Sequence, residues 1–155
     1  MKIIDPIFGC LEYNYSWFKD TAVLFFGKET EITLMIDGEA DGKFDEEQYE
    51  AYQALMKRWE QLHESFLDPI FKYYQQKRHD LGYDIAQNEN YPLVEKADQI
   101  LEMITLEGII VPYGDIEEGR DIGILFTCTW DQENGLGVRL LNEVVVEVGY
   151  QDIVM

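Results

Sequence analysis

The fold is decided by residues 45–74, DEEQYEAYQALMKRWEQLHESFLDPIFKYY, in which large apolar side chains recur three and four positions apart. A helix turns once every 3.6 residues, so this spacing places them on one face of a long amphipathic helix. Asp45 is a natural N-cap, and Gln48 takes the N3 position of a capping box. The apolar positions are Tyr49, Tyr52, Leu55, Met56, Trp59, Leu62, Phe66, Ile70, Phe71 and Tyr74.

Two prolines mark further features of the helical region. Pro69 interrupts the long pattern, and because the apolar stripe keeps its phase through it, a kink within one helix is the favoured interpretation. A restart with Asp68 as N-cap and Pro69 at N1 is the alternative. Residues 79–90 are polar and predict a loop. Pro92 then opens a shorter second helix that contains Ile100 on its apolar face.

Short runs rich in β-branched and aromatic residues predict strands on both sides of the helices. Before them, strands are expected at 7–13, 22–26 and 31–36, with 14–20 and 27–29 as connections. After them, the expected strands are 108–111, 121–130, 136–141 and 144–148. Tight turns between successive strands favour antiparallel hairpins. We therefore expect one α+β domain over residues 1–155, a mostly antiparallel β-sheet packed against one long aromatic helix and a shorter second helix.

The charge of the chain is unusual, because 31 acidic residues against 12 Lys and Arg give a net charge of −19 on 155 residues. A field of this sign repels nucleic acid and anionic membranes and attracts basic proteins. The acidity could also serve solubility alone. With 14% aromatic residues, the composition is nevertheless that of a folded domain rather than a disordered acidic tail.

The sequence indicates neither export nor a bound cofactor. No apolar run approaches the length that crosses a bilayer, and the first residues do not form a secretory signal, so we expect a cytoplasmic protein. Cys10 and Cys128 are predicted to be buried free thiols. No cofactor or metal is expected.

Residues 37–45, Asp-Gly-Glu-Ala-Asp-Gly-Lys-Phe-Asp, resemble the calcium loop of an EF-hand. The match ends at position 12, where Gln48 replaces the bidentate glutamate, and the preceding segment is strand-like where an EF-hand needs a helix. An acidic turn that caps the following helix is the favoured interpretation. A domain that binds a small ligand or calcium through Asp37, Glu39, Asp41 and Asp45 is the alternative function.

Catalytic motifs are missing from the sequence. His63 lies within the apolar stripe and His79 has no recognisable partner pattern, and there is no nucleophile elbow, phosphate loop or zinc-ligand spacing. Carboxylate pairs such as Asp131 with Glu133 could in principle serve an enzyme, but such pairs arise by chance among so many acids. We therefore do not expect an enzyme.

Residues 130–138, Trp-Asp-Gln-Glu-Asn-Gly-Leu-Gly-Val, form the strongest local signature. Their structural interpretation is a hairpin loop with positive φ at Asn134 and Gly135, close backbone approach at Gly137, and Trp130 anchored in the core.

This hairpin, together with the acid-capped helix that opens Glu46-Glu47-Gln48, resembles a group of small bacterial domains. Some members of that group accompany secreted or contact-delivered toxins as cognate immunity proteins. The resemblance implies a bacterial immunity protein, and it carries no catalytic residues over to this chain.

Charge and resemblance together predict a stoichiometric inhibitor of a basic, nuclease-like toxin domain. The carboxylates of the acidic turns would take the places of phosphates in the toxin's cleft. The partner is thus a basic protein, with no role for nucleic acid or a membrane. The predicted partner-binding residues are Asp115, Glu117, Glu118, Asp131 and Glu133.

Overall fold

The computed structural model describes residues 1–83, 88–114 and 118–155, and within them eight strands form one sheet in chain order. Neighbouring strands pair antiparallel throughout the described sheet, except that β4 and β5 run parallel. The predicted α+β fold is therefore confirmed. The strands are β1 (Lys2–Asp5), β2 (Gly9–Asn14), β3 (Ser16–Phe25), β4 (Lys28–Ile36), β5 (Ile104–Val111), β6 (Asp121–Cys128), β7 (Leu136–Leu141) and β8 (Val144–Gly149).

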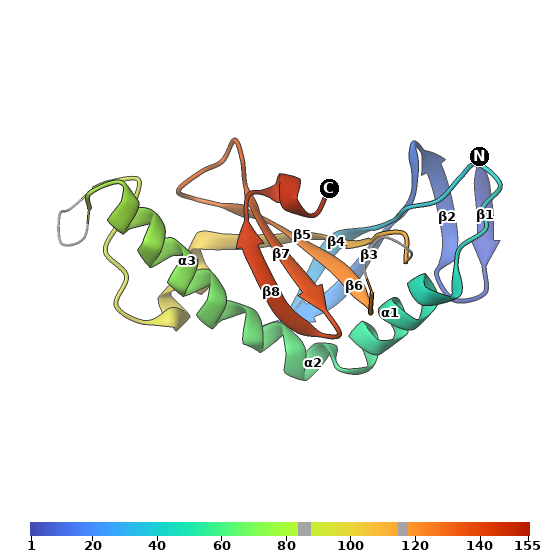
Figure 1. Cartoon of the computed structure of the whole chain (residues 1–155), viewed down its shortest axis with the longest axis horizontal. Helices are drawn as coiled ribbons and strands as arrows, with labels where there is room; N and C mark the ends of the chain where they lie inside the picture. Colours follow the sequence, from blue (N-terminus) through green and yellow to red (C-terminus); the bar gives the residue numbers. More distant parts are fainter. Residues whose placement is uncertain (84–87, 115–117) are drawn as a thin grey trace.

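The helical elements from α1 to η2 lie between β4 and β5 in the sequence and run along one face of the sheet, which we call the helix face (Figure 1). The opposite surface is the back face, and the C-terminal turn lies on it. None of the described helices combines the length and apolar character needed to cross a bilayer. The helical elements are α1 (Glu46–Lys57), α2 (Trp59–Leu62), η1 (His63–Phe66), α3 (Leu67–Asp80), η2 (Ala97–Met103) and η3 (Gln151–Ile153).

The core fills the space between the helices and the helix face. Side chains alternate between the two faces of a strand, so Ile32, Leu34 and Ile36 of β4 all point into this core. They meet helix residues such as Leu55 and Ile70, which are fully buried. The apolar stripe of the sequence is therefore the surface that covers the sheet.

The long helical pattern is divided at Arg58. The capping box at Asp45 and Gln48 is confirmed, and α1 ends at Lys57. α3 begins at Leu67 with Phe66 at its N-cap, so the predicted restart with Asp68 as N-cap and Pro69 at N1 is wrong. The change of helix type falls at the 3-10 segment η1, ahead of Pro69, and not at Pro69 itself. Pro69 lies in the first turn of α3, where its missing N–H leaves no helical hydrogen bond unmade.

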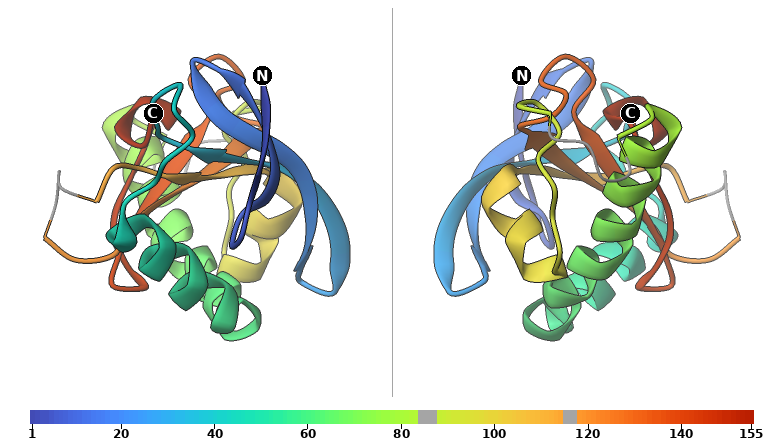
Figure 2. Two further views of the ribbon diagram at one scale, coloured as in Figure 1. Left: turned by 90° about the vertical axis from the view of Figure 1, so that its right-hand side faces the viewer. Right: turned by 90° about the vertical axis from the view of Figure 1, so that its left-hand side faces the viewer.

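The N-terminal strands are longer than the sequence indicates. Residues 14–20 were expected as a connection, but β3 begins at Ser16 and the chain reverses at Tyr15, with φ of 66°. A further strand, β1, precedes the first one expected. The error arises because Lys19 and Asp20 interrupt the apolar pattern where β3 has an exposed face. Figure 2 shows β3 and β4 as a long curved hairpin.

The shorter second helix is a 3-10 helix, η2, which begins at Ala97 rather than at Pro92. Fully buried Ile100 attaches it to the core. The expected loop at 79–90 overlaps the end of α3, which continues to Asp80, and its residues 84–87 lie outside the described residues.

The C-terminal turn η3 covers part of the back face. It lies over β6 and β7, where Gly123 and Gly137 lack side chains. A Cβ at Gly123 would lie 2.6 Å from the Cβ of Val154, and a Cβ at Gly137 would lie 2.7 Å from the carbonyl oxygen of Tyr150. Glycine at these two positions therefore allows the turn to rest directly on the sheet.

Candidate functional site

The structure separates the predicted partner-binding residues. Asp115 and Glu117 lie outside the described residues, and Glu118 is exposed just before β6. Asp131 and Glu133 follow β6 at its other end. An eight-residue strand spans roughly 26 Å, so Glu118 does not share a patch with Asp131 and Glu133.

The 130–138 hairpin has the predicted structural role. Trp130 is buried with its ring centroid 4.8 Å from that of Tyr74, and Gly135 has φ of 64°. Asn134 is not among the residues with positive φ, so that part of the prediction is wrong. Instead, the carboxylate of Asp131 accepts hydrogen bonds from the backbone and side-chain nitrogens of Asn134. Asp131 thus holds the turn together.

The acidic loop before α1 is built as a cap. The Asp45 carboxylate accepts hydrogen bonds from the backbone N–H of Gln48 at 2.8 Å and of Gly114 at 3.1 Å. The Glu39 carboxylate accepts one from the Tyr113 hydroxyl, and that of Asp41 accepts one from the Lys43 backbone. In the described ranges, no group of three or more His, Cys, Asp or Glu side chains could hold a metal ion.

The buried Gln48 explains why an amide stands where an EF-hand would have glutamate. Its side-chain nitrogen donates to the carbonyl oxygens of Asp37 at 2.7 Å and Val111 at 3.3 Å. A carboxylate could not donate these bonds. Desolvation raises the pKa of Asp37 beside it. Gln48 therefore joins α1 to the ends of β4 and β5.

His63 is a packed core residue, as expected from its place in the apolar stripe. Its Nε2 accepts the backbone N–H of Phe26 at 3.1 Å, and its Nδ1 lies 2.9 Å from the carbonyl oxygen of Trp59. These contacts assign the proton to Nδ1. The imidazole thus ties the β3–β4 turn to the helices.

The two cysteines differ in exposure. Cys128 is buried as predicted, and burial raises the pKa of its thiol to about 11. Cys10 is exposed, so the prediction of two buried thiols is wrong for it. The reason is strand alternation, because Leu11 next to it takes the core-facing position of β2.

The back face over β3, β4 and β5 carries a hollow of about 620 Å³ that we call the acidic hollow. Its carboxylates come from three strands: Asp20 on β3, Glu31 on β4 and Glu107 on β5. Small residues lie between them, since Ala22 is opposite Glu31 and Gly108 is beside Thr33 in the strand register. The hollow is lined by Asp20, Thr21, Ala22, Glu31, Ile32, Thr33 and Glu107.

Hydroxyl groups position two of these carboxylates. Thr33 donates to Asp20 at 3.1 Å, and Thr127 donates to Glu107 at 3.3 Å. Within the described part of the chain, Asp20, Glu31 and Glu107 form no ion pair, and no Lys or Arg lines the acidic hollow. Three carboxylates thus share one side of three neighbouring strands, two of them held by hydroxyl groups and none of them in an ion pair.

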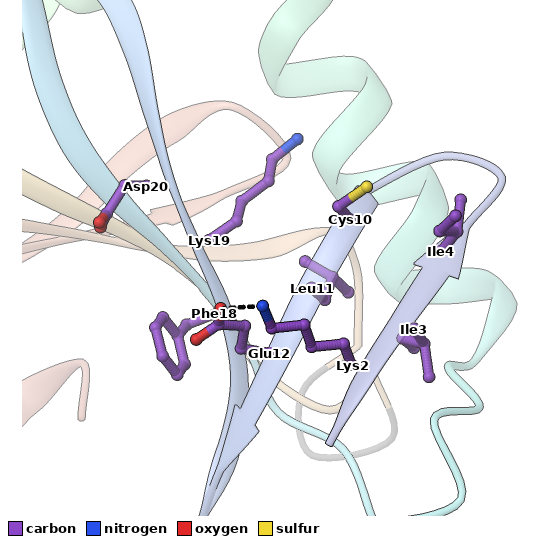
Figure 3. A pocket seen from close by; sticks show the side chains of 9 residues that line it. All are labelled: Lys2, Ile3, Ile4, Cys10, Leu11, Glu12, Phe18, Lys19 and Asp20. Carbon is purple, nitrogen blue, oxygen red and sulfur yellow. Dashed lines mark ion pairs between the residues drawn. The ribbon is translucent and has the colours of Figure 1, made fainter.

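A groove of about 760 Å³ adjoins the acidic hollow and shares Asp20 with it (Figure 3). It occupies the space where β2 and β3 diverge, which we call the strand gap. These strands pair only next to the turn at Tyr15, the last pair being Glu12 with Phe18. Side chains of Ile4, Leu11 and Phe18 give the groove an apolar lining.

The gap exists because the β1–β2 hairpin is attached to α1. The ring centroid of Phe8, in the hairpin turn, lies 5.1 Å from that of Tyr49 and 5.1 Å from that of Tyr52. The Tyr49 hydroxyl donates to the buried Asp5 at 2.6 Å. Desolvation, and then this hydrogen bond, raise the pKa of Tyr49 to about 12. The β1–β2 hairpin thus diverges from β3 and packs against α1.

Sequence reasoning missed Asp20, Glu31 and Glu107 as a group. The signal was partly present, because Thr33 and Met35 alternate with core residues and indicate a wetter face of β4. Asp20 was assigned to a connection, and Glu107 precedes the residues expected as a strand. Their convergence depends on the parallel pairing of β4 with β5, which no local pattern reveals.

Comparison with models of protein families identifies the family of the chain. Residues 7–155 match the model of a domain of unknown function, DUF6985, and the chain belongs to this family. Searches of curated proteins and of solved structures returned no match.

Proposed function

We propose that this member of the DUF6985 family binds a basic protein through the acidic hollow and inhibits it. The observation that carries the proposal is the group of carboxylates from Asp20, Glu31 and Glu107, which form no ion pair in the described structure. Grouped like charges lower stability, and a cationic partner removes that penalty on binding.

The net charge of −19 supports fast capture of such a partner. Its field steers a positively charged surface toward the protein, and this steering weakens as salt screens the charges. Inhibition follows if the surface that is covered is the partner's own binding cleft. A nuclease-like toxin has a basic cleft of this kind. We therefore propose that the protein is an immunity protein that inhibits such a toxin.

The test begins with capture of proteins from the native lysate at low salt on the tagged protein. A hollow variant, Asp20→Asn/Glu31→Gln/Glu107→Gln, is compared with a control that loses equal charge from exposed helix positions, Glu50→Gln/Glu60→Gln/Glu64→Gln. We expect a basic protein that the wild type and the control retain and the hollow variant loses. Equal loss from both variants would show that diffuse charge is responsible and would contradict the site.

Inhibition is tested with the purified captured protein. Titration with the wild type should abolish its activity at a one-to-one ratio, while the hollow variant should require at least about tenfold more protein. A further variant, Glu118→Gln/Glu133→Gln, examines the acidic turns predicted from the sequence. If only this variant loses inhibition, the turns form the interface instead of the hollow. Binding without any effect on activity would refute the inhibitor role.

The alternative of a small-ligand or calcium protein has less support. Three of the four carboxylates proposed for it, those of Glu39, Asp41 and Asp45, accept hydrogen bonds within the loop. A calcium titration followed by the melting temperature tests it directly. A site would give a melting temperature that rises with the logarithm of the calcium concentration.

A further inference from the structure

The edge of β3 toward the strand gap has backbone groups that point away from the sheet. β3 and β4 are joined by a two-residue turn, Phe26-Gly27, so their flanking pair, Phe25 and Lys28, is hydrogen-bonded across the hairpin. In an antiparallel pair such bonds alternate along the strands. The N–H and C=O groups of Asp20, Ala22 and Leu24 therefore point outward, away from β4.

At both ends of this edge the outward backbone groups have hydrogen-bond partners, as the alternating hydrogen-bond pattern predicts. At one end Phe18 pairs with Glu12 of β2. At the other, the carbonyl oxygen of Leu24 accepts a hydrogen bond from the Trp59 indole at 2.6 Å. Between them, at Asp20 and Ala22, no strand or backbone group of the described chain pairs with the outward groups. We call the stretch 19–23 the open edge.

The two sides of the open edge differ in chemistry. Lys19 and Asp20 point to opposite sides of β3 (Figure 3). On the back face, Asp20 and Glu31 belong to the acidic hollow, and Ala22 leaves space between them. On the helix face, Thr21 and Val23 lie against Tyr52 and Met56 around a small cavity of about 90 Å³.

We propose that the partner binds as an added strand on the open edge of β3, with Lys or Arg at alternate positions over the acidic hollow and apolar residues between them. A residue directly opposite Asp20 or Ala22 has its side chain on the same face as theirs, so a cation there meets Asp20 and Glu31. The next residue faces Tyr52 and Met56. The basic character of the strand rests on the proposed function; the backbone pairing rests on the open edge.

The other free edges of the sheet fit this strand less well. β1 has only four residues, so it offers a short edge for pairing with another strand. β8 contains a register shift opposite Arg139 and Leu140, which disturbs regular pairing. The open edge of β3 combines regular extended backbone with the carboxylates of Asp20 and Glu31 on its back face, while Lys19 points to the other side.

The test uses the synthetic peptide acetyl-KVKVKVK-amide and ¹⁵N-labelled protein. Addition of the peptide should shift the amide signals of Asp20, Ala22 and their neighbours on β3. N-methylation of the lysine amides should abolish binding, because these N–H groups face β3, whereas methylation of the valine amides should change affinity less than threefold. The acidic peptide acetyl-EVEVEVE-amide should not bind.

A matched substitution tests the backbone from the protein side. Ala22→Pro removes an outward N–H but no hydrogen bond to β4, so β3 remains an allowed edge strand. We expect its affinity for the peptide to fall at least tenfold, with unchanged signals in β5–β8. Binding that is unaffected by Ala22→Pro and by lysine N-methylation would overturn strand addition.

These outcomes separate the inference from the proposed function. If the hollow variant loses the captured protein but Ala22→Pro retains it, the acidic surface binds side chains only and strand addition is wrong. If the peptide does not bind the wild type at all, strand addition is also wrong. If the hollow variant retains the captured protein, the proposed function itself fails.

Discussion

The back face of the sheet is closed over β6 and β7 and open over β3, β4 and β5. In the closed half, Gly123 and Gly137 let η3 lie on the strands, so the chain covers its own surface. In the open half, Asp20, Glu31 and Glu107 stand at comparable positions of the back face. On one face of the same sheet, glycine therefore allows the chain to cover its own strands, whereas carboxylates leave the strands exposed to solvent.

The cysteines compare the core on the helix face with the open half of the back face, and they give the largest expected effect. Burial raises the pKa of Cys128 to about 11, so near pH 8 only about one thiol in a thousand is ionised. Exposed Cys10 lies in the groove beside the open half. We expect a thiol reagent to modify Cys10 at least ~100-fold faster than Cys128. Mass spectrometry of the Cys10→Ser and Cys128→Ser variants measures each rate, and equal rates would contradict the closed packing around Cys128.

Substitution of the glycines should break the closed half. Gly137→Ala places a methyl group against the backbone oxygen of Tyr150, and we expect a loss of about 2–3 kcal/mol in unfolding free energy by urea titration. The three atoms nearest to a Cβ at Gly123 all belong to Val154, so the loss caused by Gly123→Ala should shrink in a Val154→Gly background. If the losses from Gly123→Ala and from Val154→Gly are additive in the double variant, the C-terminal turn does not pack against Gly123.

The hairpin anchor at Tyr49 should matter less than the glycines. Tyr49→Phe removes a hydrogen bond to a buried carboxylate, so we expect a loss of about 1.5–2 kcal/mol at pH 7. Folding raises the pKa of Tyr49 from 10.0 to about 12, so this stabilisation is complete below pH 10 and is lost as the pH rises through 12. Wild type and variant should therefore converge in stability over this range, and a constant difference would rule out the hydroxyl as its source.

The charges of the open half should have the smallest effect on stability, with the opposite sign. Asp20→Asn/Glu31→Gln removes repulsion between neighbouring strands, and we expect a gain of about 0.3–0.5 kcal/mol at low salt. The gain should fall toward zero in 1 M salt, where the charges are screened. Glu50→Gln/Glu64→Gln, at exposed helix positions that are far apart in the sequence, serves as the control. A loss of stability in the first variant would mean that these carboxylates support the fold.

The sequence predicts the layers of the fold better than its surface. Apolar periodicity over α1–α3 and alternation in β4 identify the helix face, because burial requires those side chains. Nothing comparable constrains the back face. Asp20 was assigned to a connection, and Gly123 was an ordinary residue of an expected strand, although its neighbour in space is Val154. A local sequence pattern does not reveal contacts between distant segments. The acidic hollow and its exposure to solvent therefore follow only from the three-dimensional structure.

The parallel pairing of β4 with β5 has a consequence for the order in which the molecule assembles. The other strand pairs are joined by much shorter connections, whereas this pair must close a loop that contains α1, α3 and η2. Such closures are slow steps in folding because chain entropy is lost before the contacts form. Glu31 and Glu107 lie on opposite sides of this seam. The acidic hollow is therefore absent from any intermediate in which the two halves have not joined, so the partner binding that we propose requires the finished fold.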